Sequence, residues 1–128
     1  MTSPAEMTFR RLAIGDPKLI GAIGDLDHRD PGLHRLDDRT ESLLRIGALV
    51  ALDAPQSSYH AEVGAAQRAG ADLEDVLAVL VAIAGAVGSV RVIAAAPRIA
   101  LAAGYDIETA LEQNDPSDHE AAGSPTRE

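Results

Sequence analysis

The chain has 128 residues, a length typical of one domain, and a formal net charge of −9. Nucleic acid and anionic membrane surfaces are therefore unfavourable partners, because phosphate groups attract Lys and Arg. The chain contains no cysteine, which excludes disulfides, thiolate metal sites and cysteine nucleophiles. Since 46% of residues are hydrophobic but only 2% aromatic, we expect a core of Ala, Val, Leu and Ile.

The location is expected to be the cytoplasm. The beginning of the sequence, MTSPAEMTFRRL, has no apolar signal core, and a cysteine-free chain is compatible with a reducing compartment. The longest uncharged run, Val76–Val90, has 15 residues. This is shorter than the roughly 20 residues that a membrane-spanning helix needs.

Residues 1–39 are expected to form an N-terminal arm with one short helix over 7–14. Residues 16–39 are polar and contain several Pro and Gly residues, which indicates turns. Two histidines are crowded there among acidic residues: Asp27, His28, Asp30, His34, Asp37 and Asp38. Their irregular spacing favours a solvated polar arm over a metal site, so no metal is expected.

Apolar residues recur with helical spacing over 41–52, where Thr40 is the expected N-cap. The sequence Asp53-Ala54-Pro55 interrupts this pattern. A second helix is then expected to run to about Arg68 and to stop at Gly70.

Asp72 is the expected N-cap of a third helix, over 73–84, with Asp75 completing a variant of the capping box. This helix is apolar almost all round from residue 76, which predicts a subunit interface. Gly85 and Gly88 indicate a turn before a fourth helix that Ser89 caps.

Pro97 is expected to end or kink the fourth helix, which finishes before residue 104. Asp106 is expected to cap a short last helix to about residue 112, before a disordered tail over 113–128. The fold class is therefore all-α, with five to six helices and a helical core over 40–112.

The densest polar set within the apolar body is Glu41, Asp53, Gln56, Tyr59 and His60. On a continuous helix, Asp53, Gln56 and His60 would share one face. Glu41 lies on the preceding helix. A carboxylate that faces an imidazole can tune its pKa and pass a proton. The alternative is a solvated Glu41 and a hydrogen-bonded core His60.

Residues 36–104 resemble the carboxymuconolactone decarboxylase family, which includes the alkylhydroperoxidase D-like proteins. The resemblance rests on the Arg39–Glu41 start, the long aliphatic helix and the sequence YHAEVGAAQRAGADLEDVLAVL. It implies an alkylhydroperoxidase D-like helical bundle that assembles as a homotrimer or homohexamer.

The peroxidase branch of that family has a glutamate, two cysteines and a histidine. By the family spacing, the glutamate falls on Glu41, the histidine on His60, and the cysteine positions on Asp53 and Gln56. Without a thiolate there is no peroxidatic nucleophile, so thiol peroxidase activity is excluded.

The resemblance to the decarboxylase branch implies a cofactor-free lyase that acts by acid–base catalysis on a small carboxylate or lactone. His60 is the expected proton donor and Glu41 its partner, while Arg45 and Arg91 would hold a carboxylate; Asp53, Gln56 and Tyr59 would line the substrate site. Alternatively, Arg45 forms an ion pair with Glu41, and Arg91 forms an interface salt bridge. The sequence IAGAVGSV lacks the Tyr and Gly-x-Pro usual in that branch. The alternative function is therefore that of a non-catalytic family member, which binds a small ligand or serves as an oligomeric scaffold.

Overall fold

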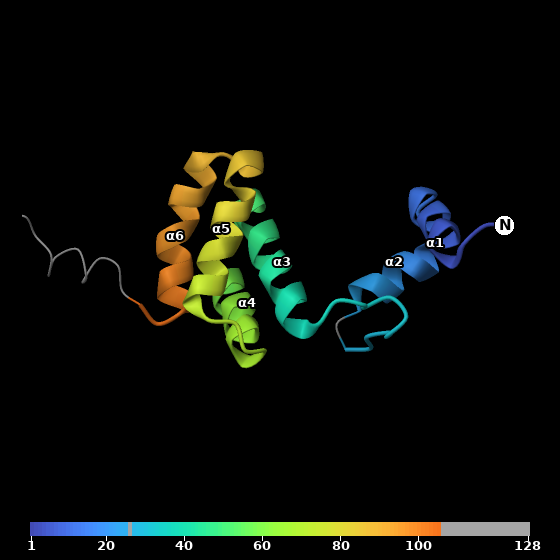
Figure 1. Cartoon of the computed structure of the whole chain (residues 1–128), viewed down its shortest axis with the longest axis horizontal. Helices are drawn as coiled ribbons and strands as arrows, with labels where there is room; N and C mark the ends of the chain where they lie inside the picture. Colours follow the sequence, from blue (N-terminus) through green and yellow to red (C-terminus); the bar gives the residue numbers. More distant parts are fainter. Residues whose placement is uncertain (26, 106–128) are drawn as a thin grey trace, which may run out of the picture. The chain divides into compact units, whose positions relative to one another are not determined.

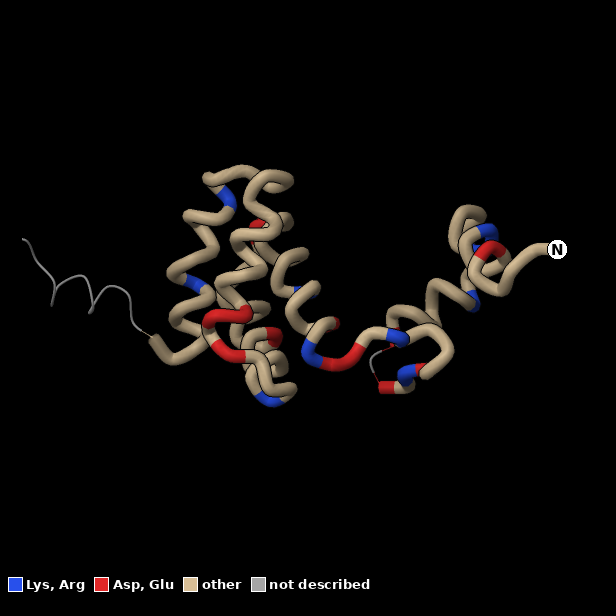
Figure 2. The backbone as a smooth tube through the Cα atoms, viewed as in Figure 1, with Lys and Arg blue, Asp and Glu red and all other residues tan. Residues whose placement is uncertain are grey.

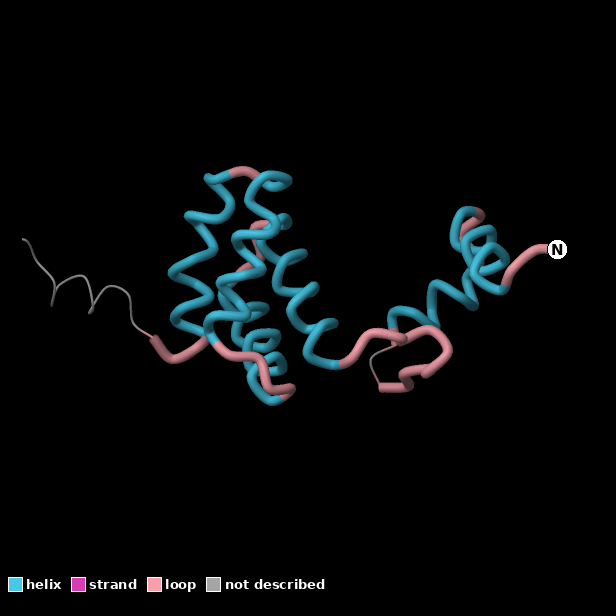
Figure 3. The backbone as a smooth tube through the Cα atoms, in the orientation of Figure 1, coloured by secondary structure: helices cyan, strands magenta, loops and turns pink. Residues whose placement is uncertain are grey.

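The computed structural model describes residues 1–25 and 27–105, and every regular element within them is a helix (Figure 3). The expected all-α class with about six helices is confirmed. The chain divides into two compact units, Met1–Asp37 and Asp38–Glu128. The expected last helix and tail lie outside the described residues.

The first unit contains two helices, α1 (Pro4–Ala13) and α2 (Pro17–Gly24). Ser3 and Glu6 form a capping box at the start of α1, and Asp16 caps α2 by accepting a hydrogen bond from the Lys18 amide. The expectation of a single helix here was wrong. Asp16 as N-cap, followed by Pro17 in the first turn, starts a second helix in spite of the glycines that follow.

The second unit contains α3 (Asp38–Leu52), α4 (Gln56–Arg68), α5 (Leu73–Val87) and α6 (Ser89–Ala102). In Figure 1 these four helices lie side by side: α3 packs on α4 and α5, and α6 packs on the same two helices. Their shared core is aliphatic apart from one tyrosine, and its least exposed large side chains are Ile46, Val50, Tyr59 and Val63.

The helix boundaries correct several expectations. Helix α3 begins at Asp38, so Thr40 lies inside the first turn rather than at the N-cap. Helix α5 continues through Gly85 and ends only before Gly88, while α6 continues through Pro97. The capping box of Asp72 and Asp75 is confirmed, with hydrogen bonds of 2.8 and 3.0 Å.

Replacement by alanine is expected to have opposite effects on stability at Gly85 and at Gly88. Gly88 has φ +90° and ψ 153°, a region that essentially only glycine occupies, so Gly88→Ala is expected to cost about 1–3 kcal/mol of unfolding free energy. Gly85 is helical, and an added Cβ would meet open space. Gly85→Ala is therefore expected to stabilise by about 0.5–1 kcal/mol. Thermal unfolding of the two variants measures both signs; a loss in Gly85→Ala equal to that in Gly88→Ala would contradict this account.

The hairpin of α5 and α6 exposes large aliphatic side chains. Val81, Val90 and Ile93 are 72%, 78% and 69% exposed, and we call these three residues the hairpin patch. Figure 2 shows that α5 carries no charge beyond its first turn. Among the described residues, no helix is both long enough and apolar enough to cross a membrane.

Candidate functional site

Arg45 joins two carboxylates at the contact of α3 with α4. Its guanidinium lies 3.0 Å from the Glu41 carboxylate and 3.2 Å from the Glu62 carboxylate. The side chains of Glu41 and Glu62 are only 12% and 20% exposed, so this cation balances two partly buried negative charges. Arg45 thus forms the ion pair with Glu41, one helical turn away, that was the alternative to a role in binding a carboxylate.

A second polar group lies where α4 starts and α6 ends. Arg98 donates to the Asp53 carboxylate at 3.1 Å and to the Ala54 carbonyl at 2.9 Å. Gln56 donates to the Arg98 carbonyl at 2.7 Å, and its Nε2 lies 3.5 Å from Nε2 of His60. We call the four side chains of Asp53, Gln56, His60 and Arg98 the Arg98 cluster. Three of them were candidates from the sequence.

Asp53 holds a left-handed backbone conformation, with φ +52°, immediately after α3. The amide of Asp53 donates to the Val50 carbonyl and that of Ala54 to the Leu49 carbonyl, which closes the helix end. The turn between α3 and α4, rather than a continuous helix, is what brings Asp53 to Arg98. Sequence analysis missed Arg98 because its partners are more than forty positions away, and only the packing of α4 against α6 joins them.

Glu41 and His60 are not brought together. Glu62 is the α4 side chain that reaches the Glu41–Arg45 pair, and His60 precedes it by two positions. Residues two apart on a helix point in nearly opposite directions, since each residue turns the helix by about 100°. His60 is an exposed residue beside Gln56, and no hydrogen bond or ion pair joins it to Glu41. The expected facing of carboxylate and imidazole is therefore absent from this arrangement.

Tyr59 is a core residue with 0% exposure. Burial raises the pKa of its phenol above the usual value of 10.0; Arg98 opposes this shift and Asp53 adds to it. The side chain, which was expected to line a substrate site, therefore packs inside the second unit.

Arg91 is exposed in the first turn of α6, and it forms no ion pair with another described residue. It belongs neither to the Glu41–Arg45–Glu62 group nor to the Arg98 cluster. The predicted arginine clamp of Arg45 and Arg91 is thus divided between α3 and α6, with Arg45 engaged by two glutamates.

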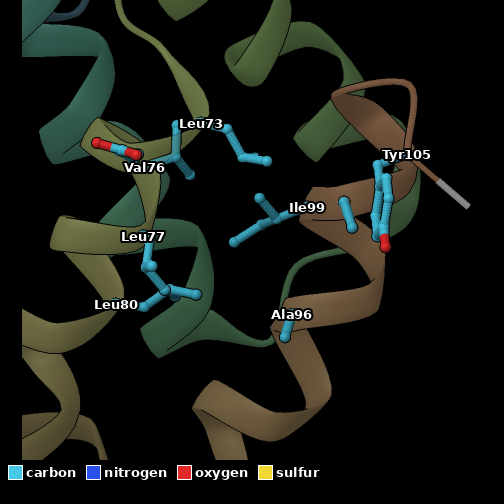
Figure 4. A pocket seen from close by; sticks show the side chains of 9 residues that line it. Leu73, Val76, Leu77, Leu80, Ala96, Ile99 and Tyr105 are labelled. Carbon is cyan, nitrogen blue, oxygen red and sulfur yellow. The ribbon is translucent and has the colours of Figure 1, made fainter. Parts of the chain in front are cut away.

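An apolar hollow of the second unit lies between α5 and α6 (Figure 4). It measures about 290 Å³. We call it the α5–α6 groove; its walls, almost entirely apolar, are formed by Leu73, Glu74, Val76, Leu77, Leu80, Ala96, Ile99, Ala100 and Tyr105. Such a lining suits aliphatic side chains and offers almost nothing to orient a carboxylate. Among the described residues, no three His, Asp or Glu side chains gather as a metal site would require.

Comparison with known proteins gives no family assignment. No family model matches the chain, and no curated protein or solved structure is detectably similar to it. The class of protein that the structure defines is a small all-α helical protein.

Proposed function

We propose that this protein is a non-catalytic helical scaffold, related to the carboxymuconolactone decarboxylase-like proteins, that assembles with copies of itself through the α5–α6 hairpin. The observation that carries the proposal is the hairpin patch, in which three aliphatic side chains are each at least 69% exposed. The three side chains lie on two helices that pack on each other, and extensive exposed aliphatic surface is typical of interaction sites.

The energetics favour a second copy as the partner. Full burial of an aliphatic side chain contributes about 1.5–3 kcal/mol, so the hairpin patch alone offers several kcal/mol on association. Residues 76–90 carry no charge, so burying them in such an interface removes no charged group from water. The charged candidates on α3 and α4, in contrast, are engaged with one another, which supports a structural role for Arg45.

Light scattering coupled to size exclusion tests the assembly. We expect a mass of at least three chains at micromolar concentration, in agreement with the trimers and hexamers of the family that the sequence resembles. A mass equal to one chain over the whole concentration range would rule out the scaffold.

A second candidate function, acid–base catalysis on a small carboxylate, is favoured by the Arg98 cluster. There an exposed imidazole, an amide and a guanidinium lie together at the α4–α6 contact. His60 would hold or donate the proton, and the Arg98 guanidinium would bind the carboxylate alongside its bond to Asp53.

His60→Gln tests this second function. Because His60 is exposed and has a polar approach to Gln56 alone among the described residues, the variant is expected to keep its melting temperature and mass. It should lose turnover, or the thermal shift that a panel of small carboxylates and lactones induces. His28→Gln, which changes an exposed histidine of the first unit, is the control. If no compound shifts or is converted by the unaltered protein, the catalytic proposal fails while the scaffold proposal stands.

A further inference from the structure

We infer that two copies of this chain pair through their α5 helices, which run antiparallel and cross at Val81. The inference rests on the proposed scaffold function and specifies how the copies meet. Beyond the first turn of α5, every exposed position is uncharged, and these positions share one face of the helix: Leu77, Ala78, Val81, Ala82, Gly85 and Ala86. A helix face that stays in water is ordinarily polar, so this face indicates a covering partner.

The exposed face of α5 lies between two apolar hollows. In Figure 1, α5 stands between α3 and α6, and it packs on both helices. Leu77 also lines the α5–α6 groove, and Ala82 lines a hollow of about 300 Å³ between α3 and α5. A second helix laid along α5 can place its side chains in these hollows, as ridge-into-groove packing requires. If that helix is the α5 of a second copy, each copy offers the same surface to the other, as in a two-fold pair.

The spacing of residues along this face is symmetric about Val81. Leu77 lies four positions before Val81, and Gly85 lies four positions after it. Glu74 and Gly88 are each seven positions away. Because four and seven residues are about one and two helical turns, all of these positions follow one stripe. In an antiparallel pair centred on Val81, the large Leu77 therefore faces Gly85 of the second copy, where an added Cβ meets open space in the single chain.

The same register matches opposite charges. It brings Glu74 of one copy to Gly88 of the other, where α6 begins. Glu74 is exposed and forms no ion pair with another described residue. The start of α6 has no side-chain cap and no acidic residue in its first turn, which contains the exposed Arg91. A carboxylate is stabilising at such a helix start, and it would give Arg91 an interface ion pair.

Parallel α5 helices would lack both matches. Glu74 would then face Glu74, with repulsion between the carboxylates, and Gly85 would face Gly85, which leaves a void. Of the two assemblies that the family resemblance implies, only the homohexamer contains two-fold pairs. Val90 and Ile93, on α6, are not needed for the α5 contact and can join one pair to the next. The number of chains in the assembly should therefore be even.

The absence of cysteine permits a direct test of this register. Chains with Leu77→Cys, co-expressed with chains that carry Gly85→Cys, should form a disulfide between the two variants on mild oxidation, because facing Cβ atoms can approach to about 4 Å. The mass of the linked product identifies the two chains. Leu77→Cys alone and Leu52→Cys alone, both at exposed positions, are the controls and should link several-fold more slowly. Linkage of Leu77→Cys to itself at an equal rate would indicate parallel helices and overturn the inference.

An exchange of side-chain size tests the same contact without oxidation. Gly85→Leu adds a side chain that has space in the single chain but collides with Leu77 of the second copy, so the mass by light scattering should fall to half or less. Adding Leu77→Ala should restore the mass, because the large and small residues have then exchanged places. Gly21→Leu, at a helical glycine of α2 that also has open space, is the control. An unchanged mass in Gly85→Leu would overturn the inference.

Failure of this pairing can be told apart from failure of the scaffold function. A mass of three chains for the unaltered protein, or an assembly in which the mixed cysteine variants do not link, would overturn the pairing and leave the scaffold function in place. A mass of one chain would overturn both.

Discussion

Replacing Val81 and Ile93 by lysine together is expected to convert the assembled protein into single chains. Both side chains are about 70% exposed in the isolated chain, at 72% and 69%, so neither substitution removes core packing. Lysine is also a good helix former. In an interface, however, two unpaired ammonium groups per chain would have to be desolvated, which costs more than the lost aliphatic burial alone.

Light scattering measures the mass of the assembly, which should fall at least three-fold in the double variant. The melting temperatures of the variant and the unaltered protein are compared at the same chain concentration. Leu52→Lys is the matched control, because Leu52 is 75% exposed at the end of α3 and does not belong to the hairpin patch. The interface would have to be placed elsewhere if Leu52→Lys dissociated the assembly and the hairpin variant did not.

Tyr59→Ala is expected to lower the free energy of unfolding by about 3–5 kcal/mol, the usual cost of removing a large buried ring. Tyr59 is one of four large side chains that are essentially inaccessible in the core of the second unit. A domain of this size is stabilised by only about 5–15 kcal/mol, so this loss is a large share of the total. Urea unfolding followed by circular dichroism measures it, and Tyr105→Ala, which removes a 51% exposed ring, should cost much less.

The free energy of unfolding is expected to depend on pH through Tyr59. Burial raises the pKa of Tyr59 above 10.0, so between the unfolded and folded pKa values the unfolded chain has lost a proton that the folded chain retains. The stability from this group is complete below pH 10 and falls as the pH rises above 10, by at most about 1.4 kcal/mol per pH unit. Tyr59→Phe should remove this part of the alkaline slope. An unchanged slope in the variant would mean that Tyr59 does not account for it.

The candidate site was predictable in part. Asp53, Gln56 and His60 attract attention in the sequence because they interrupt apolar helices, and the structure does place them near one another. Glu41 was grouped with them by spacing alone. No hydrogen bond or ion pair joins Glu41 to His60, and spacing along a chain gives the face of one helix but not which face a neighbouring helix meets.

The sequence by itself determined the helices of the second unit, whose apolar periodicity, capping box at Asp72 and glycine stops are local signals. The sequence also excluded thiol chemistry, because the chain contains no cysteine. Only the tertiary structure decided that Arg45 joins Glu41 to Glu62, that Arg98 closes the turn at Asp53, and that the α5–α6 groove is left open among the described residues. These contacts join residues distant in sequence, and the relative rotation of packed helices depends on how all their side chains interlock.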